Sequence, residues 1–233
     1  MLRVRNLVAR YGDFQALFGV DFDLKQGAIV ALIGANGAGK STFLKSIAGQ
    51  IASKSGEIRF NSEEISGLPP DRIVREGVSM VPEGRRLFRS LSVEENLKVG
   101  GFAGRQGRWT LNAVYDLFPQ LKEKRHVTAT ALSGGQQQMV AIGRGLMSNP
   151  DLLMCDEVSL GLSPAVIKDI YRVFPQLRAE GLSLIVVEQD IDAALAISDY
   201  VYCFMHGKVT LHGAPVELTK EQISAAYFGL EAA

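Results

Sequence analysis

The sequence predicts an α/β fold: a mostly parallel sheet flanked by helices, an N-terminal antiparallel β subdomain and an inserted helical subdomain. Three observations support it. Residues 28–33, 152–155 and 183–187 are short apolar runs, as expected of strands buried on both faces. Helical patterns follow such runs, and this alternation is typical of parallel sheets. From residue 93 to about residue 150, amphipathic segments replace the strands.

The first elements alternate apolar and polar side chains. This period of two at residues 2–8 and 20–24 predicts antiparallel strands with one exposed face. Residues 41–48 have instead the apolar spacing of a helix. The sequence then predicts a strand at 56–60, a short helix opened by Pro69 and Pro70, and a strand at 78–81.

The middle of the chain has a helical pattern. The predicted helices cover residues 93–99, 109–118 and 136–147, and a glycine-rich linker separates the first two. We interpret residues 84–150 as a helical subdomain inserted into one domain that spans residues 1–233. Residues 1–83 and 151–233 are predicted to form the core, together with the antiparallel β subdomain.

The last third returns to strands and helices. Ser163 and Pro164 are typical of a helix start, and Gly181 is typical of a helix end. The sequence therefore predicts one helix between them. It also predicts a strand at 183–187, a helix at 191–197, and strands at 201–205 and 208–211 that pair around His206 and Gly207.

Composition excludes several classes of protein. The 25 basic and 25 acidic residues balance, so the chain has no basic surplus for a nucleic-acid backbone, and we expect no nucleic-acid partner. Cys155 and Cys203 lie in apolar runs, which favours buried free thiols over a disulfide. No signal-peptide pattern and no apolar run of about 18 residues is present, so any membrane role is expected to depend on partners.

Residues 34–41, GANGAGKS, match the phosphate-binding pattern G-x-x-x-x-G-K-[ST] between a buried strand and a helix. Glycines let backbone amides turn toward phosphate oxygens, Lys40 supplies charge to the β- and γ-phosphates, and the Ser41 hydroxyl ligates Mg²⁺. The motif predicts a P-loop NTPase core that binds ATP and Mg²⁺. The expected ATP-binding residues here are Gly34, Asn36, Gly37, Ala38, Gly39, Lys40, Ser41 and Thr42.

A second motif ends the apolar strand at 152–155 with two carboxylates. Asp156 can hold Mg²⁺ through water, as the acidic residue of a Walker B strand does. Glu157, the next residue, can orient or deprotonate the attacking water. The metal site is therefore predicted to include Ser41 and Asp156, with Glu157 as the catalytic base.

The third motif distinguishes among P-loop enzymes. Residues 132–136, LSGGQ, precede a predicted helix, with Ser133 placed to cap it and two glycines that permit close approach of a phosphate. A kinase or a GTPase leaves this motif unexplained, and the sequence lacks the N-K-x-D guanine motif. Taken together, these residues resemble the ABC ATPase family over nearly the whole chain.

The resemblance assigns further roles. It implies that Ser133, Gly134, Gly135 and Gln136 bind the γ-phosphate of ATP held by another cassette, so that the enzyme works as a head-to-tail dimer. It also implies that Tyr11 stacks on adenine and that residues 159–162 form the loop known in this family as the D-loop.

Two positions depart from the family pattern. Glu83 stands where the family usually has glutamine, and the resemblance places it near Mg²⁺ or the attacking water, so we count Glu83 as a metal ligand together with Ser41 and Asp156. Gln189 stands where the family usually has histidine. A glutamine can donate a hydrogen bond to the γ-phosphate but cannot carry a proton, which leaves Glu157 as the base. We count Gln189 as a catalytic residue on this basis.

Finer motifs, namely VPEGRRLF, LSVEENL, SLGLSP, VEQD and AAYFGL, resemble the shorter ATPase subunit of branched-chain amino-acid importers. This likeness implies uptake of branched-chain amino acids or related small polar solutes. The implied partners are a second ABC ATPase or a second copy, transmembrane permease subunits, and indirectly a periplasmic binding protein. The implied location is peripheral, at the cytoplasmic face of the plasma membrane.

Alternatives remain at this level. The catalytic motifs also fit the ATPase of an exporter. A non-transport ABC protein is disfavoured, because the chain is a single neutral cassette without heptads. Residues 84–97 hold basic and apolar side chains suited to a groove for a short helix of a membrane subunit, although Leu87 and Phe88 would also suit a core.

Overall fold

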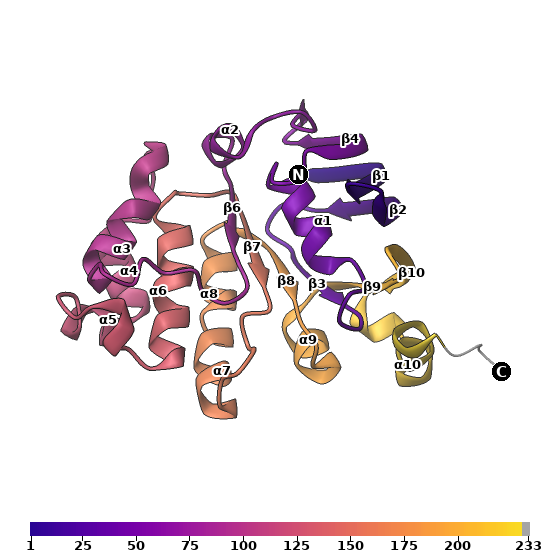
Figure 1. Cartoon of the computed structure of the whole chain (residues 1–233). Coiled ribbons are helices and arrows are strands. Elements are labelled where there is room, and N and C mark those ends of the chain that lie inside the picture. Colours follow the sequence, from indigo (N-terminus) through magenta and orange to yellow (C-terminus); the bar gives the residue numbers. More distant parts are fainter. Residues whose placement is uncertain (230–233) are drawn as a thin grey trace.

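A computed structural model of the chain describes residues 1–229 and contains two sheets (Figure 1). Leu230, the last residue of AAYFGL, and the predicted domain end at residue 233 lie outside the described residues. The larger sheet has the strand order β10-β9-β3-β8-β7-β6. Its strands are β3 (Ile29–Ile33), β6 (Val78–Val81), β7 (Leu152–Asp156), β8 (Ser183–Val187), β9 (Tyr200–Met205) and β10 (Lys208–Gly213). All neighbours pair in parallel except β9 and β10, which confirms the predicted mostly parallel sheet.

The smaller sheet is antiparallel, as predicted for the N-terminal subdomain. It has the order β2-β1-β4-β5 and consists of β1 (Leu2–Tyr11), β2 (Phe14–Leu24), β4 (Ser53–Phe60) and β5 (Glu63–Glu64). The strands β1 and β2 are longer than predicted. Their pairing shifts register between Val4 and Leu7, between Leu7 and Val8, and again after Ala9, so the period of two that marks a strand in the sequence is interrupted.

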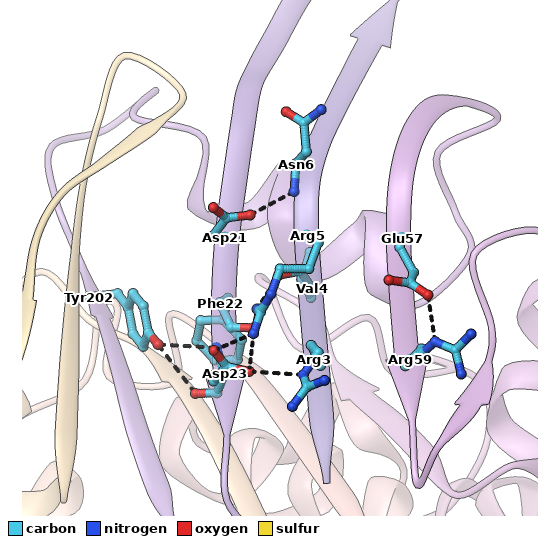
Figure 2. Close-up of polar contacts among 10 residues, drawn as sticks. All are labelled: Arg3, Val4, Arg5, Asn6, Asp21, Phe22, Asp23, Glu57, Arg59 and Tyr202. Atoms are coloured by element: carbon cyan, nitrogen blue, oxygen red, sulfur yellow. Dashed lines mark hydrogen bonds and ion pairs between the residues drawn. The ribbon is translucent and has the colours of Figure 1, made fainter.

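The two sheets are joined at β2 and β9 (Figure 2). The Tyr202 hydroxyl accepts a hydrogen bond from the Asp23 backbone amide at 3.1 Å and donates one to the Asp23 carbonyl at 3.3 Å. The Asp23 carboxylate pairs with Arg5 of β1 at 2.8 Å. The Phe22 ring packs between the rings of Tyr202 and Phe43, at 4.6 and 5.1 Å between centroids. The antiparallel sheet is therefore attached to β9 of the larger sheet and to Phe43, which follows the phosphate-binding motif.

Helices replace strands between β6 and β7, which confirms the inserted helical part of the predicted fold. They are α3 (Val93–Gly100), α4 (Leu111–Leu117), α5 (Pro119–Glu123) and α6 (Gly134–Leu146), and they lie beyond β6, away from the antiparallel sheet (Figure 1). The predicted helix at 109–118 starts only at Leu111, because the Thr110 side chain caps it there. The division of the chain at residues 84 and 150 stays a prediction.

The remaining helices cover the core sheet. They are α1 (Lys40–Ile47), α2 (Pro70–Arg75), α7 (Pro164–Tyr171), α8 (Phe174–Ala179), α9 (Ile191–Ile197) and α10 (Lys220–Phe228). The single helix predicted from Ser163 to Gly181 was wrong, because it is divided into α7 and α8. Pro175 lacks an amide hydrogen and its ring conflicts with the carbonyl of Tyr171, so the first helix ends there.

Two further expectations concern single side chains and the membrane. Cys155 and Cys203 are both buried and free, as predicted. Among residues 1–229, no helix is both long enough and apolar enough to cross a membrane.

Candidate functional site

The loop between β3 and α1 is shaped by its glycines. Gly34 and Gly39 have φ angles of 147° and 106°, in the region that favours glycine. A Cβ on Gly34 would lie 2.2 Å from the Phe204 carbonyl oxygen, and one on Gly39 would lie 2.9 Å from the Leu17 side chain. No side chain caps the start of α1. The first amides of the helix thus remain available to an anion held by the loop.

Lys40 is directed back into this loop. The residue is 4% exposed, and its Nζ donates hydrogen bonds to the carbonyl oxygens of Gly34, at 2.5 Å, and Ala35, at 3.0 Å. Burial lowers the pKa of Lys40, and the negative charges of Glu157 and Asp156 oppose this effect. The ammonium group is therefore held by the two loop carbonyls, within the electrostatic influence of the two carboxylates, and a phosphate chain can replace the carbonyls.

The two carboxylates follow β7, as predicted. The Ser41 hydroxyl donates a hydrogen bond to Asp156 Oδ1 at 2.9 Å. Burial raises the pKa of Asp156, and the negative charges of Glu157 and Glu83 act in the same direction. The hydrogen bond from Ser41 and the positive charge of Lys45 lower it. A divalent cation beside Asp156 would favour its charged form. No cluster of three metal-ligating side chains exists within the described residues, but Mg²⁺ usually takes few protein ligands and completes its shell with water and phosphate.

Glu157 lies across from the end of β8. It is half-buried and has a φ angle of 51°, a left-handed conformation that residues other than glycine rarely adopt. The side-chain amide of Gln189 donates a hydrogen bond from its Nε2 to Glu157 Oε2 at 2.8 Å. The two residues predicted to be catalytic therefore contact each other directly, although 32 positions separate them. In this arrangement the Gln189 amide orients the carboxylate of Glu157.

Glu83 is exposed and lies at the end of β6, next to β7. Its charge acts on Asp156 but, within residues 1–229, it forms no ion pair. Its predicted role as a metal ligand therefore remains a prediction.

A hollow of about 470 Å³ opens over the phosphate loop. Tyr11 lies in its wall, 47% exposed, with its hydroxyl 3.4 Å from the Thr42 hydroxyl. Sequence reasoning missed Phe14 and Phe18 of β2 and His206 of the β9–β10 turn, which also line it. The four-residue spacing of the two phenylalanines, which places them on one face of a strand, was an available signal. The full lining is Tyr11, Phe14, Gln15, Ala16, Phe18, Gly37, Ala38, Gly39, Lys40, Ser41, Thr42, Glu157, His206 and Gly207.

The β9–β10 turn connects two walls of this hollow. The Gly207 amide donates a hydrogen bond to the Ala38 carbonyl of the phosphate loop at 2.9 Å. The Gly207 carbonyl accepts one from the Phe18 amide of β2, also at 2.9 Å. A single glycine therefore links the phosphate loop to the hairpin that bears Tyr11.

The LSGGQ segment caps α6 but does not line this hollow. The Ser133 hydroxyl accepts a hydrogen bond from the Gln136 amide at 3.3 Å, and the Gln136 side chain accepts one from the Ser133 amide at 3.1 Å, so Ser133 caps the helix as predicted. A Cβ on Gly135 would lie 2.4 Å from Val166 of α7. Packing of α6 on α7 thus requires this glycine, independently of any phosphate. Ser133 itself is exposed, and Gly134 is partly so.

The comparisons with known proteins agree with this arrangement. Residues 17–159 match the ABC transporter family. Over 98% of its length, the chain is 46% identical to the whole of BraG from Pseudomonas aeruginosa, a high-affinity branched-chain amino acid transport ATP-binding protein. This chain belongs to the ABC transporter family. It is an ATPase cassette of that family, which confirms the predicted enzyme class and the predicted resemblance.

This chain also resembles ATP-binding proteins of other transport systems and solved ABC cassettes. It is 31% identical to LptB of Escherichia coli, a lipopolysaccharide export system ATP-binding protein, over 98% of this chain and 97% of that one. A solved ATP-binding cassette of an ABC transporter matches it with a TM-score of 0.87 at 26% identity, over 100% of this chain and 99% of that chain. The predicted fold class is therefore confirmed.

Proposed function

We propose that this ABC ATPase hydrolyses MgATP in a site shared with a second cassette, and that hydrolysis drives uptake of branched-chain amino acids or related small polar solutes. The observation that supports the chemistry is the meeting of three strand ends. The loop after β3 contributes Lys40, β7 contributes Asp156 and Glu157, and β8 contributes Gln189. A phosphate-binding lysine, a hydroxyl–carboxylate pair and an oriented base are what phosphoryl transfer requires.

In this proposal the triphosphate lies along the loop from Gly34 to Thr42, with Tyr11 against the adenine. Lys40 moves from its two carbonyl partners to the β- and γ-phosphates. Ser41 and Asp156 would hold Mg²⁺, with Glu83 near it, and the ion would neutralise charge on the phosphate oxygens. The hydrogen bond between Ser41 and Asp156 supports such a site, because it brings the two oxygens that would bind the ion to 2.9 Å from each other.

Glu157 accepts the proton of the attacking water as the water oxygen bonds to the γ-phosphorus and the bond to ADP breaks. Gln189 keeps the Glu157 carboxylate oriented and donates a neutral hydrogen bond, but it takes no proton. Histidine-based proton shuttling is therefore not part of this mechanism.

The position of the LSGGQ segment supports a shared site. The exposed Ser133 does not line the hollow over the phosphate loop of its own chain. A second cassette, either a related ATPase or a second copy, is therefore required to bring Ser133, Gly134, Gly135 and Gln136 to the γ-phosphate. This arrangement gives a head-to-tail dimer with nucleotide in the interface.

A groove between α2, α3 and α6 supports a membrane partner. It has a volume of about 340 Å³ and is lined in part by Phe88, Val99 and Arg144. Phe88 is 49% exposed whereas Leu87 packs on the helical core, so only Phe88 is free for a partner. We assign this groove to a short helix of a transmembrane permease, which places the ATPase peripherally at the cytoplasmic face of the plasma membrane. A periplasmic binding protein would act through the permease.

The similarity to BraG over the whole chain supports import, and the lower similarity to LptB makes export the alternative. The test is uptake of labelled leucine, isoleucine and valine by cells that lack this chain. We expect wild-type protein to restore uptake and Glu157→Gln to fail. Normal uptake in the deletion strain would contradict the importer assignment.

The shared site is tested by sedimentation. We expect the Glu157→Gln variant with MgATP, in the presence of its partner cassette, to sediment as a dimer, and with ADP as a monomer, since nucleotide bound between subunits stabilises the dimer by linkage. Adding Ser133→Arg should abolish the shift while nucleotide binding persists. The same sedimenting species with ATP and with ADP would contradict the shared site.

A further inference from the structure

A buried carboxyl group lies directly behind the proposed base. Glu188, the residue before Gln189, is 1% exposed, and its Oε2 accepts a hydrogen bond from the Ser159 hydroxyl at 2.5 Å. In the described part of the chain, its other oxygen and the nearby Tyr171 hydroxyl are buried and have no hydrogen-bond partner. Burial of a carboxyl group is costly, and the mechanism proposed above does not use this one.

Two hydrogen bonds connect the same pair of loops. One loop follows β7 and the other follows β8. Ser159 of the first bonds to Glu188 of the second at 2.5 Å, and Glu157 of the first bonds to Gln189 of the second at 2.8 Å. Between these attachments the chain forms a tight turn, with the Leu160 amide 3.3 Å from the Glu157 carbonyl. Glu157 begins this turn in its left-handed conformation.

A left-handed glutamate persists only when its surroundings hold it there. The Gln189 bond fixes the carboxylate of Glu157 but not its backbone. The Ser159 bond, two residues further along, attaches the backbone of the turn to a buried group. Both attachments are therefore needed to define the position of the base.

We propose that Glu188 is a positioning residue, which holds the turn at 157–160 through Ser159 and so places the carboxylate of Glu157 for catalysis. The proposal rests on the proposed role of Glu157 as the base. Burial raises the pKa of Glu188, while the hydrogen bond from the Ser159 hydroxyl lowers it. A glutamine at 188 keeps an oxygen for the Ser159 hydroxyl, so it preserves the attachment without the titratable group.

The test compares variants of the full chain in steady-state MgATP hydrolysis with its partner cassette. We expect Ser159→Ala to lower kcat about tenfold, equivalent to about 1.4 kcal/mol, with the KM for ATP unchanged. Glu188→Ala should lower kcat similarly and Glu188→Gln should restore most of it. The double variant Ser159→Ala/Glu188→Ala should be no slower than the slower single variant, because both remove the same attachment.

A matched control removes an equivalent hydroxyl elsewhere. Ser198, also half-buried, donates a hydrogen bond to the Ala194 carbonyl at 2.7 Å and lies at the far end of α9. Ser198→Ala should leave kcat unchanged. Hydrogen exchange without nucleotide provides a second readout: amides of residues 158–162 should exchange faster in Ser159→Ala than in Ser198→Ala.

The outcomes separate this inference from the proposed function. If Glu157→Gln retains turnover, Glu157 is not the base and the proposed chemistry fails. If Glu157→Gln is inactive while folded Ser159→Ala keeps wild-type kcat and exchange, the positioning role alone is overturned. A rise in KM with unchanged kcat would also overturn it, because a misplaced base slows the chemical step rather than binding.

Discussion

Arg144 connects α6 to the segment that follows β6. Its guanidinium donates hydrogen bonds to the carbonyl oxygens of Arg86 at 2.8 Å and Arg85 at 3.0 Å. Both of these residues are left-handed, with φ angles of 45° and 66°. The same guanidinium lies over the Phe88 ring, 5.7 Å from its centroid. We predict that Arg144→Met loosens this segment and lowers the stability of the whole chain.

The size of the effect follows from these contacts. A hydrogen bond from a charged donor contributes about 1.5 kcal/mol, so the two bonds contribute about 3 kcal/mol. The cation–π contact adds about 0.5 kcal/mol, whereas methionine retains the packing of the aliphatic stem. In a domain of this length, about 3 kcal/mol corresponds to a fall in Tm of roughly 6–12 °C. Arg144→Lys should lose about half as much, because one ammonium reaches one carbonyl well.

The assay is urea unfolding of the purified chain, with the slope m checked to be constant. The matched control is Arg172→Met, since Arg172, just after α7, forms an exposed ion pair with Asp169 and should change stability by no more than about 0.5 kcal/mol. If Arg144→Met unfolds within about 0.5 kcal/mol of the wild type, the two hydrogen bonds contribute nothing net and the reasoning is refuted.

Four further variants test the site. Gln189→Ala should lower kcat about tenfold through loss of one hydrogen bond, whereas Glu157→Gln should lower it at least about a hundredfold. Both values are measured in steady-state ATPase assays, and equal losses of kcat would contradict this order. Lys40→Ala should abolish MgATP binding in calorimetry, and measurable affinity near wild type would remove its phosphate role. Gly135→Ala should cost about 1–3 kcal/mol in urea unfolding through overpacking on α7, and unchanged stability would count against that contact. Phe88→Asp should reduce co-purification with the permease while ATP binding persists; intact co-purification would exclude this groove.

The central strands were predictable because nearly all of their side chains are buried, which gives largely apolar runs in the sequence. Residues 78–81 and 183–187 were predicted with the bounds that the structure has, and 152–155 was one residue short of β7. The ends of β1 and β2 could not be predicted, because the shifts of register in this hairpin depend on pairing between the strands. The α7–α8 break was missed although Pro175 signals it.

The candidate site divides in the same way. The phosphate loop is a local motif, and its strand–loop–helix setting could be predicted from sequence. The contacts of Gln189 with Glu157 and of Ser159 with Glu188 join residues 32 and 29 positions apart, so no local pattern contains them. The left-handed backbone of Glu157 was equally hidden, because glutamate carries no preference for it.

The link made by Gly207 has a thermodynamic consequence for the cassette. Its amide and carbonyl hold the phosphate loop and β2 together, so the surfaces proposed for the triphosphate and for the adenine ring are prearranged relative to one another. Nucleotide binding then requires little ordering of the pocket, and more of the contact energy appears as affinity. We expect any rearrangement that accompanies hydrolysis to preserve these two hydrogen bonds.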